Sequence, residues 1–177
     1  MAQIKGSNGQ VAEVDNENRM QVASVSEPFD KHRNKEQKAW ALYFTNTPAG
    51  ANDYFFYIKN TGTKDLDIQD IRISSSVPTQ IFYNHVSGVA VGGTDVNPTN
   101  RNLGSSVSPV ATIQQGVDIT GLTDLAVVFF EECDVANRMY HLRITSNIIV
   151  PQGQAVAFKR VESTGLINCV VSMVEAE

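Results

Sequence analysis

From residue 39 to the end of the chain, short runs rich in β-branched and aromatic residues alternate with clusters of Gly, Pro, Asn and Ser. Each run is about 5–9 residues long, which suits strands better than helices. No helical apolar repeat persists beyond about two turns. The pattern predicts an all-β fold, an antiparallel β-sandwich of jelly-roll type. The expected strands are 39–45, 54–60, 66–74, 79–86, 106–114, 125–132, 138–150, 154–161 and 166–174.

Residues 1–38 differ in composition from the rest of the chain. They contain one aromatic residue, Phe29, many small or polar residues, and a charge-rich run over 30–38. Such a segment cannot bury enough apolar surface to form a core. The sequence therefore predicts an extended N-terminal arm over 1–38 and a β-sandwich domain over 39–177. The charge-rich run is interpreted as a solvated linker, although a short helix over 34–42 is an alternative.

The arm contains one segment, residues 19–25, with the pattern of a strand. A strand without a core of its own can gain main-chain hydrogen bonds by adding to the open edge of another sheet. We therefore expect the arm to bind a partner, and the residues expected to make this contact are Arg19, Met20, Val22, Val25 and Phe29.

Two pairs of strands are expected to form hairpins. A five-residue connection containing Gly joins 54–60 to 66–73, and a Pro-Gln-Gly sequence joins 148–150 to 154–158. Gly and Pro supply the permissive and the fixed φ values that a chain reversal needs. Both connections are therefore predicted to link neighbouring strands of one sheet.

The apolar residues of the segment 66–73 change parity between Ile68 and Ile71. Side chains of a strand alternate between its two faces, so one buried face cannot contain both residues without an extra residue between them. The sequence therefore predicts a β-bulge near Gln69 and Asp70.

Residues 87–105 contain four Gly and one Pro. A connection of this length within a compact domain is usually functional or mobile. We expect this segment to be the main variable loop of the domain.

Charge and hydropathy exclude several kinds of partner. The net charge is −5, and the whole acidic excess falls in 39–177. Because Lys and Arg dominate phosphate binding, no nucleic-acid partner is expected. No stretch approaches the ~18 apolar residues of a membrane span, and the N-terminus lacks the apolar region of a secretory signal, so synthesis in the cytoplasm and no membrane contact are expected. Cys133 and Cys169 lie in apolar runs and are expected to be unpaired core residues, with a disulfide left open.

The sequence offers no catalytic or metal-binding motif. His32, His85 and His141 are separated in sequence, and no P-loop, metal-protease or nucleophile-elbow pattern occurs. The acidic cluster 131–134 could present oxygen ligands near His141, but adjacent strand residues point to opposite faces, so a solvated strand end is the better interpretation. We expect no enzyme activity, no catalytic residues, no cofactor and no metal.

Three segments together resemble a family of small virion proteins of tailed bacteriophages. The first comprises Met1-Ala-Gln-Ile-Lys-Gly-Ser7 and Glu17-Asn-Arg-Met-Gln-Val22. The second is Phe56-Tyr-Ile-Lys-Asn60 with the following Asp65-Leu-Asp-Ile68, and the third is Asn100-Arg-Asn-Leu-Gly-Ser-Ser106. Their order and spacing match over about the first two thirds of the chain. The resemblance implies a non-enzymatic component of a virion, made in the host cytoplasm.

The resemblance leads to one principal expectation and to alternatives. The principal one is a capsid decoration or cement protein, which binds the major capsid protein or another virion protein and reaches neighbouring subunits with its arm. A neck, tail or fibre protein is an alternative. So is a carbohydrate-binding module, in which Phe82 and Tyr83 face a host glycan together with the polar residues Asn84, Asp95, Asn97 and Asn100.

The run Leu125–Phe130 contains more consecutive apolar residues than an alternating strand needs. It predicts a strand that is covered on both faces, either by the same chain or by another subunit. We expect a symmetric homo-oligomer, with a trimer preferred because the resemblance points to particle surfaces rich in three-fold sites.

Overall fold

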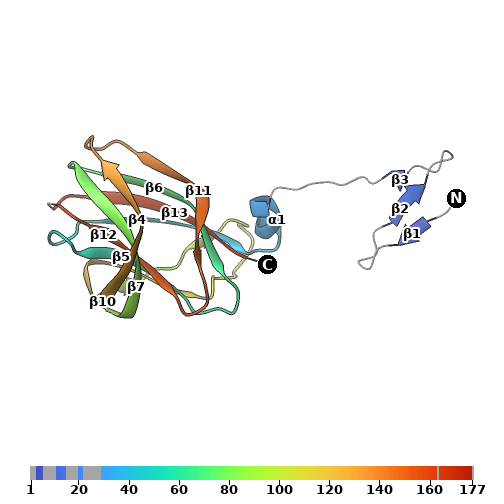
Figure 1. Ribbon diagram of the computed structural model, residues 1–177, viewed down its shortest axis with the longest axis horizontal. Helices are drawn as coiled ribbons and strands as arrows, with labels where there is room; N and C mark the ends of the chain where they lie inside the picture. The colour runs from blue at the N-terminus through green and yellow to red at the C-terminus, as the bar shows by residue number, and fades with distance from the viewer. Residues whose placement is uncertain (1–2, 6–10, 15–19, 22–28, 163, 177) are drawn as a thin grey trace.

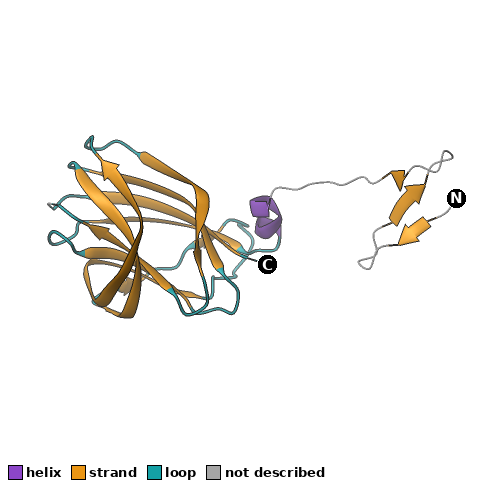
Figure 2. Cartoon of the chain, in the orientation of Figure 1, coloured by secondary structure: helices purple, strands orange, loops and turns teal. Residues whose placement is uncertain are grey.

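The computed structural model describes residues 3–5, 11–14, 20–21, 29–162 and 164–176, with side chains described over 32–141, 148–162 and 164–176. Two antiparallel five-stranded sheets form the body of the molecule, with one short helix at their end (Figure 1, Figure 2). The all-β sandwich expected from the sequence is confirmed.

The two sheets draw their strands from interleaved parts of the chain. In spatial order, the first sheet contains β11 (Tyr140–Val150), β6 (Leu66–Ser75), β13 (Ile167–Glu175), β4 (Ala39–Asn46) and β9 (Thr99–Asn100). The second contains β5 (Tyr54–Asn60), β12 (Ala155–Arg160), β7 (Thr79–Val91), β10 (Ala111–Cys133) and β8 (Thr94–Asp95). From β4 to β7, and again from β10 to β13, successive strands alternate between the sheets.

The core between the sheets is built around stacked aromatic rings. The ring of Phe44 on β4 stacks on that of Phe56 on β5, with centroids 4.5 Å apart. Phe158 of β12 contacts Phe56 at 4.9 Å and Tyr83 of β7 at 4.7 Å. All four side chains are buried among aliphatic residues of both sheets. Such rings bury large areas and prefer offset or edge-on contacts, so they hold the two layers together.

The predicted β-bulge in β6 is confirmed. Against β13, Asp70 pairs with Ser172 and Ile68 pairs with Met173, so Gln69 has no partner in the ladder. Ile68 and Ile71 are consequently both fully buried, although their spacing is odd.

Both predicted hairpins are wrong. β5 and β6 belong to different sheets, as do β11 and β12, so each connection crosses from one layer to the other. A turn between layers needs the same Gly and Pro residues as a hairpin, and the sequence pattern does not distinguish the two.

Asn60, a buried residue at the end of β5, ties these two crossings together. Its side-chain amide donates hydrogen bonds to the carbonyl oxygens of Lys64 and Val150, both at 2.8 Å. Its main-chain oxygen accepts from the amide of Gly153 at 2.8 Å. One side chain thereby fixes the ends of two connections that are far apart in sequence.

Residues 111–114 of the expected strand 106–114, and the whole of the expected strand 125–132, belong to a single strand, β10, which has 23 residues; residues 106–110 precede it and are not strand. Its first part pairs with β5 and its second part pairs with β7. β12 also pairs with both β5 and β7, so these four strands form a closed circuit of hydrogen-bonded neighbours. Gly116 and Gly121, which suggest a turn, lie at register irregularities inside the strand.

The region expected to be one long loop, 87–105, is partly ordered as strand. β7 continues to Val91, and β8 and β9 follow within the same region. Asn100 is buried and donates hydrogen bonds to the carbonyl oxygens of Gln37 at 2.7 Å and Val107 at 3.0 Å. These contacts anchor the segment to the sandwich.

A short helix, α1 (Phe29–Lys35), precedes the first sandwich strand. The alternative helix over 34–42 is wrong for most of its length, because β4 begins at Ala39. Arg33 is 3% exposed and donates a hydrogen bond to the carbonyl oxygen of Glu175 at 2.6 Å, beside its ion pair with Glu36. The interpretation of this run as solvated linker is therefore wrong for Arg33, which attaches α1 to the end of β13.

The described part of the arm contains three short strands, β1 (Gln3–Lys5), β2 (Val11–Val14) and β3 (Met20–Gln21). They form one antiparallel sheet in the order β1-β2-β3, so β3 is an edge strand within the described residues.

Of the residues expected to bind a partner, Met20 lies in β3 and Phe29 begins α1. Arg19, Val22 and Val25 lie outside the described residues. The expected partner contact of these residues stays a prediction.

Candidate functional site

The second half of β10 exposes apolar side chains on both of its faces. Every residue of the run Leu125–Phe130 is exposed, and the exposed fraction of its large side chains ranges from 38% for Phe129 to 55% for Val127. A strand in a two-layer sandwich ordinarily buries one face against the other sheet. The expectation that this run is covered on both faces is therefore not met within the described part of the chain.

The register of β10 against β7 is interrupted twice within this run. Asp124 pairs with Val86 and Ala126 pairs with His85, so Leu125 between them has no partner on β7. Val128 likewise has no partner, because Val127 pairs with Asn84 and Phe129 pairs with Tyr83. Each extra residue turns the strand and disturbs its in-and-out alternation. The run therefore does not keep the regular alternation that would direct one set of its side chains to the core.

This half of β10 is also an open sheet edge. Among the described strands it pairs with β7 alone, because β8 reaches only Gln114 and Gln115 in the first half. An open edge presents main-chain N–H and C=O groups that another strand can bind. The run contains neither Lys nor Pro, the residues that commonly protect such edges.

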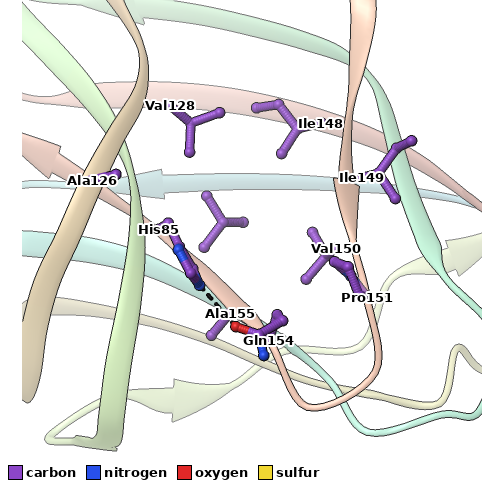
Figure 3. Close-up of a pocket in the computed structure, with 10 residues that line it drawn as sticks. His85, Ala126, Val128, Ile148, Ile149, Val150, Pro151, Gln154 and Ala155 are labelled. Carbon is purple, nitrogen blue, oxygen red and sulfur yellow. Dashed lines mark hydrogen bonds between the residues drawn. The ribbon is translucent and has the colours of Figure 1, made fainter.

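An apolar groove of about 420 Å³ lies between this edge and β11. Figure 3 shows Ala126 and Val128 on one side, Ile148 facing them, Ile149 on the far side of β11, and Gln154 below. The remaining lining residues are His85, Val150, Pro151, Ala155 and Val156. At the bottom, Nε2 of His85 lies 2.8 Å from Oε1 of Gln154. The groove suits an apolar side chain or strand better than a polar small molecule.

Aromatic rings extend the exposed surface onto β7. Phe82 stacks on Phe130 with centroids 5.7 Å apart, and Phe129 lies 6.3 Å from Phe130. Tyr83 points the other way and is fully buried. Burial raises its pKa well above the ordinary value. The two aromatic residues considered for glycan binding therefore lie on opposite faces of β7.

The asparagines considered for glycan binding do not gather at one surface. Asn84 is buried and donates to Oδ1 of Asp124 at 2.6 Å, and Asn100 is buried against Gln37 and Val107. Both amides support the fold. Asp95 and Asn97, the other two polar residues considered, are exposed. The expected glycan partner loses Asn84 and Asn100 from its site and stays a prediction.

The residues of the acidic cluster 131–134, which follows the apolar run, do not point towards one common site. Cys133 is buried in the core, whereas Asp134 accepts a hydrogen bond from the Tyr140 hydroxyl. His141 instead pairs with Asp70 of β6. Over the residues that the structure describes, no group of three His, Cys, Asp or Glu side chains is placed to hold a metal ion.

The two cysteines are free thiols buried in the core. Burial, with a smaller contribution from Glu131, raises the pKa of Cys133 to about 12. Burial likewise raises the pKa of Cys169. Because the thiolate is the nucleophilic form, neither thiol is activated for catalysis near neutral pH.

One polar cluster joins all four strands of the closed circuit. Asp124 of β10 accepts hydrogen bonds from the Tyr54 hydroxyl, from Nδ2 of Asn84 at 2.6 Å and from Nζ of Lys159 at 2.6 Å. Burial and the Asp124 carboxylate raise the pKa of Tyr54, so its hydroxyl stays protonated and donates. The cluster fixes the start of the exposed half of β10.

Acid is expected to weaken this cluster. Partial burial raises the pKa of Asp124, but hydrogen bonds from Lys159, Tyr54 and Asn84 outweigh burial and leave the pKa below 3.8. A lowered pKa stabilises the fold above the unfolded-state value, and this stabilisation is lost as pH falls through the folded-state value. Asp124→Asn should therefore cost up to about 1 kcal/mol at pH 7, because the carboxylate is partly exposed, and progressively less below about pH 4.

Urea denaturation of wild type and variant at pH 7 and pH 3 measures this difference. Asp118→Asn, at an exposed carboxylate on the same strand, is the matched control and should change the free energy of unfolding little at either pH. An Asp124→Asn effect that is equal at both pH values would contradict the assignment.

No helix in the described part of the chain has both the length and the apolar character needed to cross a membrane. Comparison with known proteins finds no matching family model, curated protein or solved structure.

Proposed function

We propose that the protein is a non-enzymatic structural protein of a virion, which attaches to neighbouring virion subunits through the second half of β10. The observation that carries this proposal is the exposure of Leu125–Phe130 along an open sheet edge. A contiguous apolar surface of this kind marks a protein interaction site, since soluble monomers rarely leave one uncovered.

The form of the surface favours a protein partner. It combines unpaired main-chain groups, an apolar groove and stacked aromatic rings, which together suit an added strand whose side chains enter the groove. The polar cluster at Asp124 and the buried thiols are used in packing and hydrogen bonding within the chain. These features support a binding role more than a catalytic one.

The kind of particle is proposed from the sequence resemblance. Small virion proteins of tailed bacteriophages suggest a decoration or cement protein on the outer capsid, with the major capsid protein as partner. Attachment of many copies gains strength through avidity, so a modest strand-addition surface in each copy is sufficient.

Val128→Lys tests the proposal at the surface itself. Val128 is 47% exposed and lines the groove, so a lysine there fits in the free protein but places a charge against the partner. We expect attachment to virions that lack the protein to weaken at least about tenfold in co-sedimentation. The thermal midpoint of the isolated protein should change little.

Val110→Lys provides the matched control, because Val110 is 58% exposed and is not among the residues that line the groove. It should co-sediment like the wild type. Equal attachment of both variants would overturn the proposal, and binding of the isolated protein to host cells instead of virions would favour the receptor-binding alternative.

A further inference from the structure

The open edge of β10 has an uncompensated charge at one end. Beyond the apolar run lie Glu131 and Glu132, and neither makes an ion pair among the described residues. Their neighbours on β7 are the uncharged Ile81 and Gln80. At the other end, the charge of Asp124 is already balanced by Lys159. The edge therefore suits a strand that brings a positive charge to Glu131 and Glu132.

This charge pattern disfavours pairing between the β10 strands of two copies. Antiparallel pairing centred on the apolar run would place Asp124 opposite Glu131 or Glu132, and parallel pairing would place the glutamates beside their own copies. Like charges directly opposite one another destabilise a strand pair. A different strand is needed to cover this edge.

The arm contains a segment of the required chemistry. Residues 19–25 begin with Arg19, continue with apolar Met20, Val22 and Val25, and contain no acidic residue. The segment has the same length as Leu125–Glu131. Within the described residues, β3 is the edge of the arm sheet and pairs with β2 alone, so its other side is free to pair.

We infer that the arm segment 19–25 of a second copy of this chain adds as an antiparallel strand to the open edge of β10. Arg19 then lies opposite Glu131, next to Glu132 along the edge, and the apolar residues of the arm cover Leu125–Phe130. The inference rests on the proposed role of β10 as the docking edge. The neighbouring virion subunit at this edge is then a second copy of this chain, and loss of this contact lowers attachment to the particle through lost avidity.

The length of the connection to α1 favours a second copy over the chain's own arm. Only residues 26–28 separate Val25 from Phe29, and such a tether spans at most about 14 Å. α1 lies against β4 and β13, whereas β11, across the groove from β10, is two or three strands further along the first sheet. To reach β10, the chain's own arm would have to cover about 10–14 Å across the first sheet and about 10 Å more between the two sheets.

An arm that binds the edge of the next copy makes a heterologous contact, since donor and acceptor are different surfaces. Such contacts either close into rings or continue as filaments. Reciprocal exchange in a dimer and a closed trimer, the assembly expected from the sequence, are the smallest closed assemblies consistent with this contact.

Charge reversal of the full-length protein tests the inference. Arg19→Glu, and separately the pair Glu131→Lys with Glu132→Lys, should each weaken self-association at least about tenfold, as measured by light scattering and sedimentation over micromolar concentrations. All three substitutions combined should restore association. Arg101→Glu, at an exposed arginine outside the arm, is the control for net charge and should have little effect.

Three results would overturn the inference. One is unchanged association of Arg19→Glu, the second is failure of the combined variant to recover, and the third is a wild type that stays monomeric while its β10 edge is protected from proteolysis by its own arm. If any of these occurs while Val128→Lys still prevents attachment to virions, the arm assignment fails and the proposed function stands. If Val128→Lys attaches normally, the proposed function itself fails.

Discussion

Phe56→Ala is expected to lower the free energy of unfolding by about 3–5 kcal/mol. Phe56 is fully buried and is the only ring in the described aromatic stack with contacts below 5 Å to both Phe44 and Phe158. Removing it leaves a cavity between the two sheets that Phe44, held on the opposite strand, cannot fill by a small movement. Equilibrium denaturation in urea with circular dichroism measures the loss.

Phe130→Ala is the matched control for this change. The same atoms are removed, but Phe130 is 51% exposed at the open edge, so the expected loss is below about 1 kcal/mol. Both variants should be compared at low protein concentration so that association does not contribute. A Phe56→Ala loss as small as that of Phe130→Ala would show that the aromatic stack does not hold the sheets together.

The strands of the sandwich were largely predictable because alternation of apolar residues is a local property. Residues 54–60 were identified as a strand from their own composition, and the bulge at Gln69 followed from the parity of Ile68 and Ile71. A side-chain period of two leaves no other way to bury both isoleucines.

The topology was not predictable in the same way, because it depends on long-range contacts. The connection after Asn60 has the composition of a hairpin turn, yet Asn60 binds the carbonyl of Val150, ninety residues away, and directs the chain to the other sheet. Likewise, the strands expected over 106–114 and 125–132 are separate in the sequence pattern, although residues 111–133 form one strand, β10.

The candidate site was visible only in part. The apolar run Leu125–Phe130 is evident in the sequence, which predicts that other residues cover both faces of this strand. The described residues of the same chain do not cover them. The groove beside it also needs Ile148, Ile149 and Gln154, which reach β10 only because β11 and β12 lie in different sheets. No local sequence pattern indicates that these distant segments lie side by side in the fold.

Gly121→Ala is expected to destabilise the protein by about 3 kcal/mol and to loosen the second half of β10. Gly121 has a φ of 76°, a conformation that costs an alanine roughly 1 kcal/mol or more. In addition, a Cβ atom at this position would collide with the carbonyl oxygen of Val89 on β7. The collision can be relieved only if β7 and β10 separate where the exposed half of β10 begins.

Gly153→Ala separates the cost of backbone strain from the cost of the collision with Val89. Gly153 has a φ of 77°, nearly that of Gly121, but a Cβ atom there would meet no other atom within 4 Å. Its expected loss is about 1 kcal/mol, due to backbone strain alone. Urea denaturation measures both losses, and hydrogen exchange of residues 122–133 should accelerate in Gly121→Ala while it stays slow in Gly153→Ala. Equal losses would mean that the close approach of β7 and β10 at Gly121 does not determine where the docking edge lies.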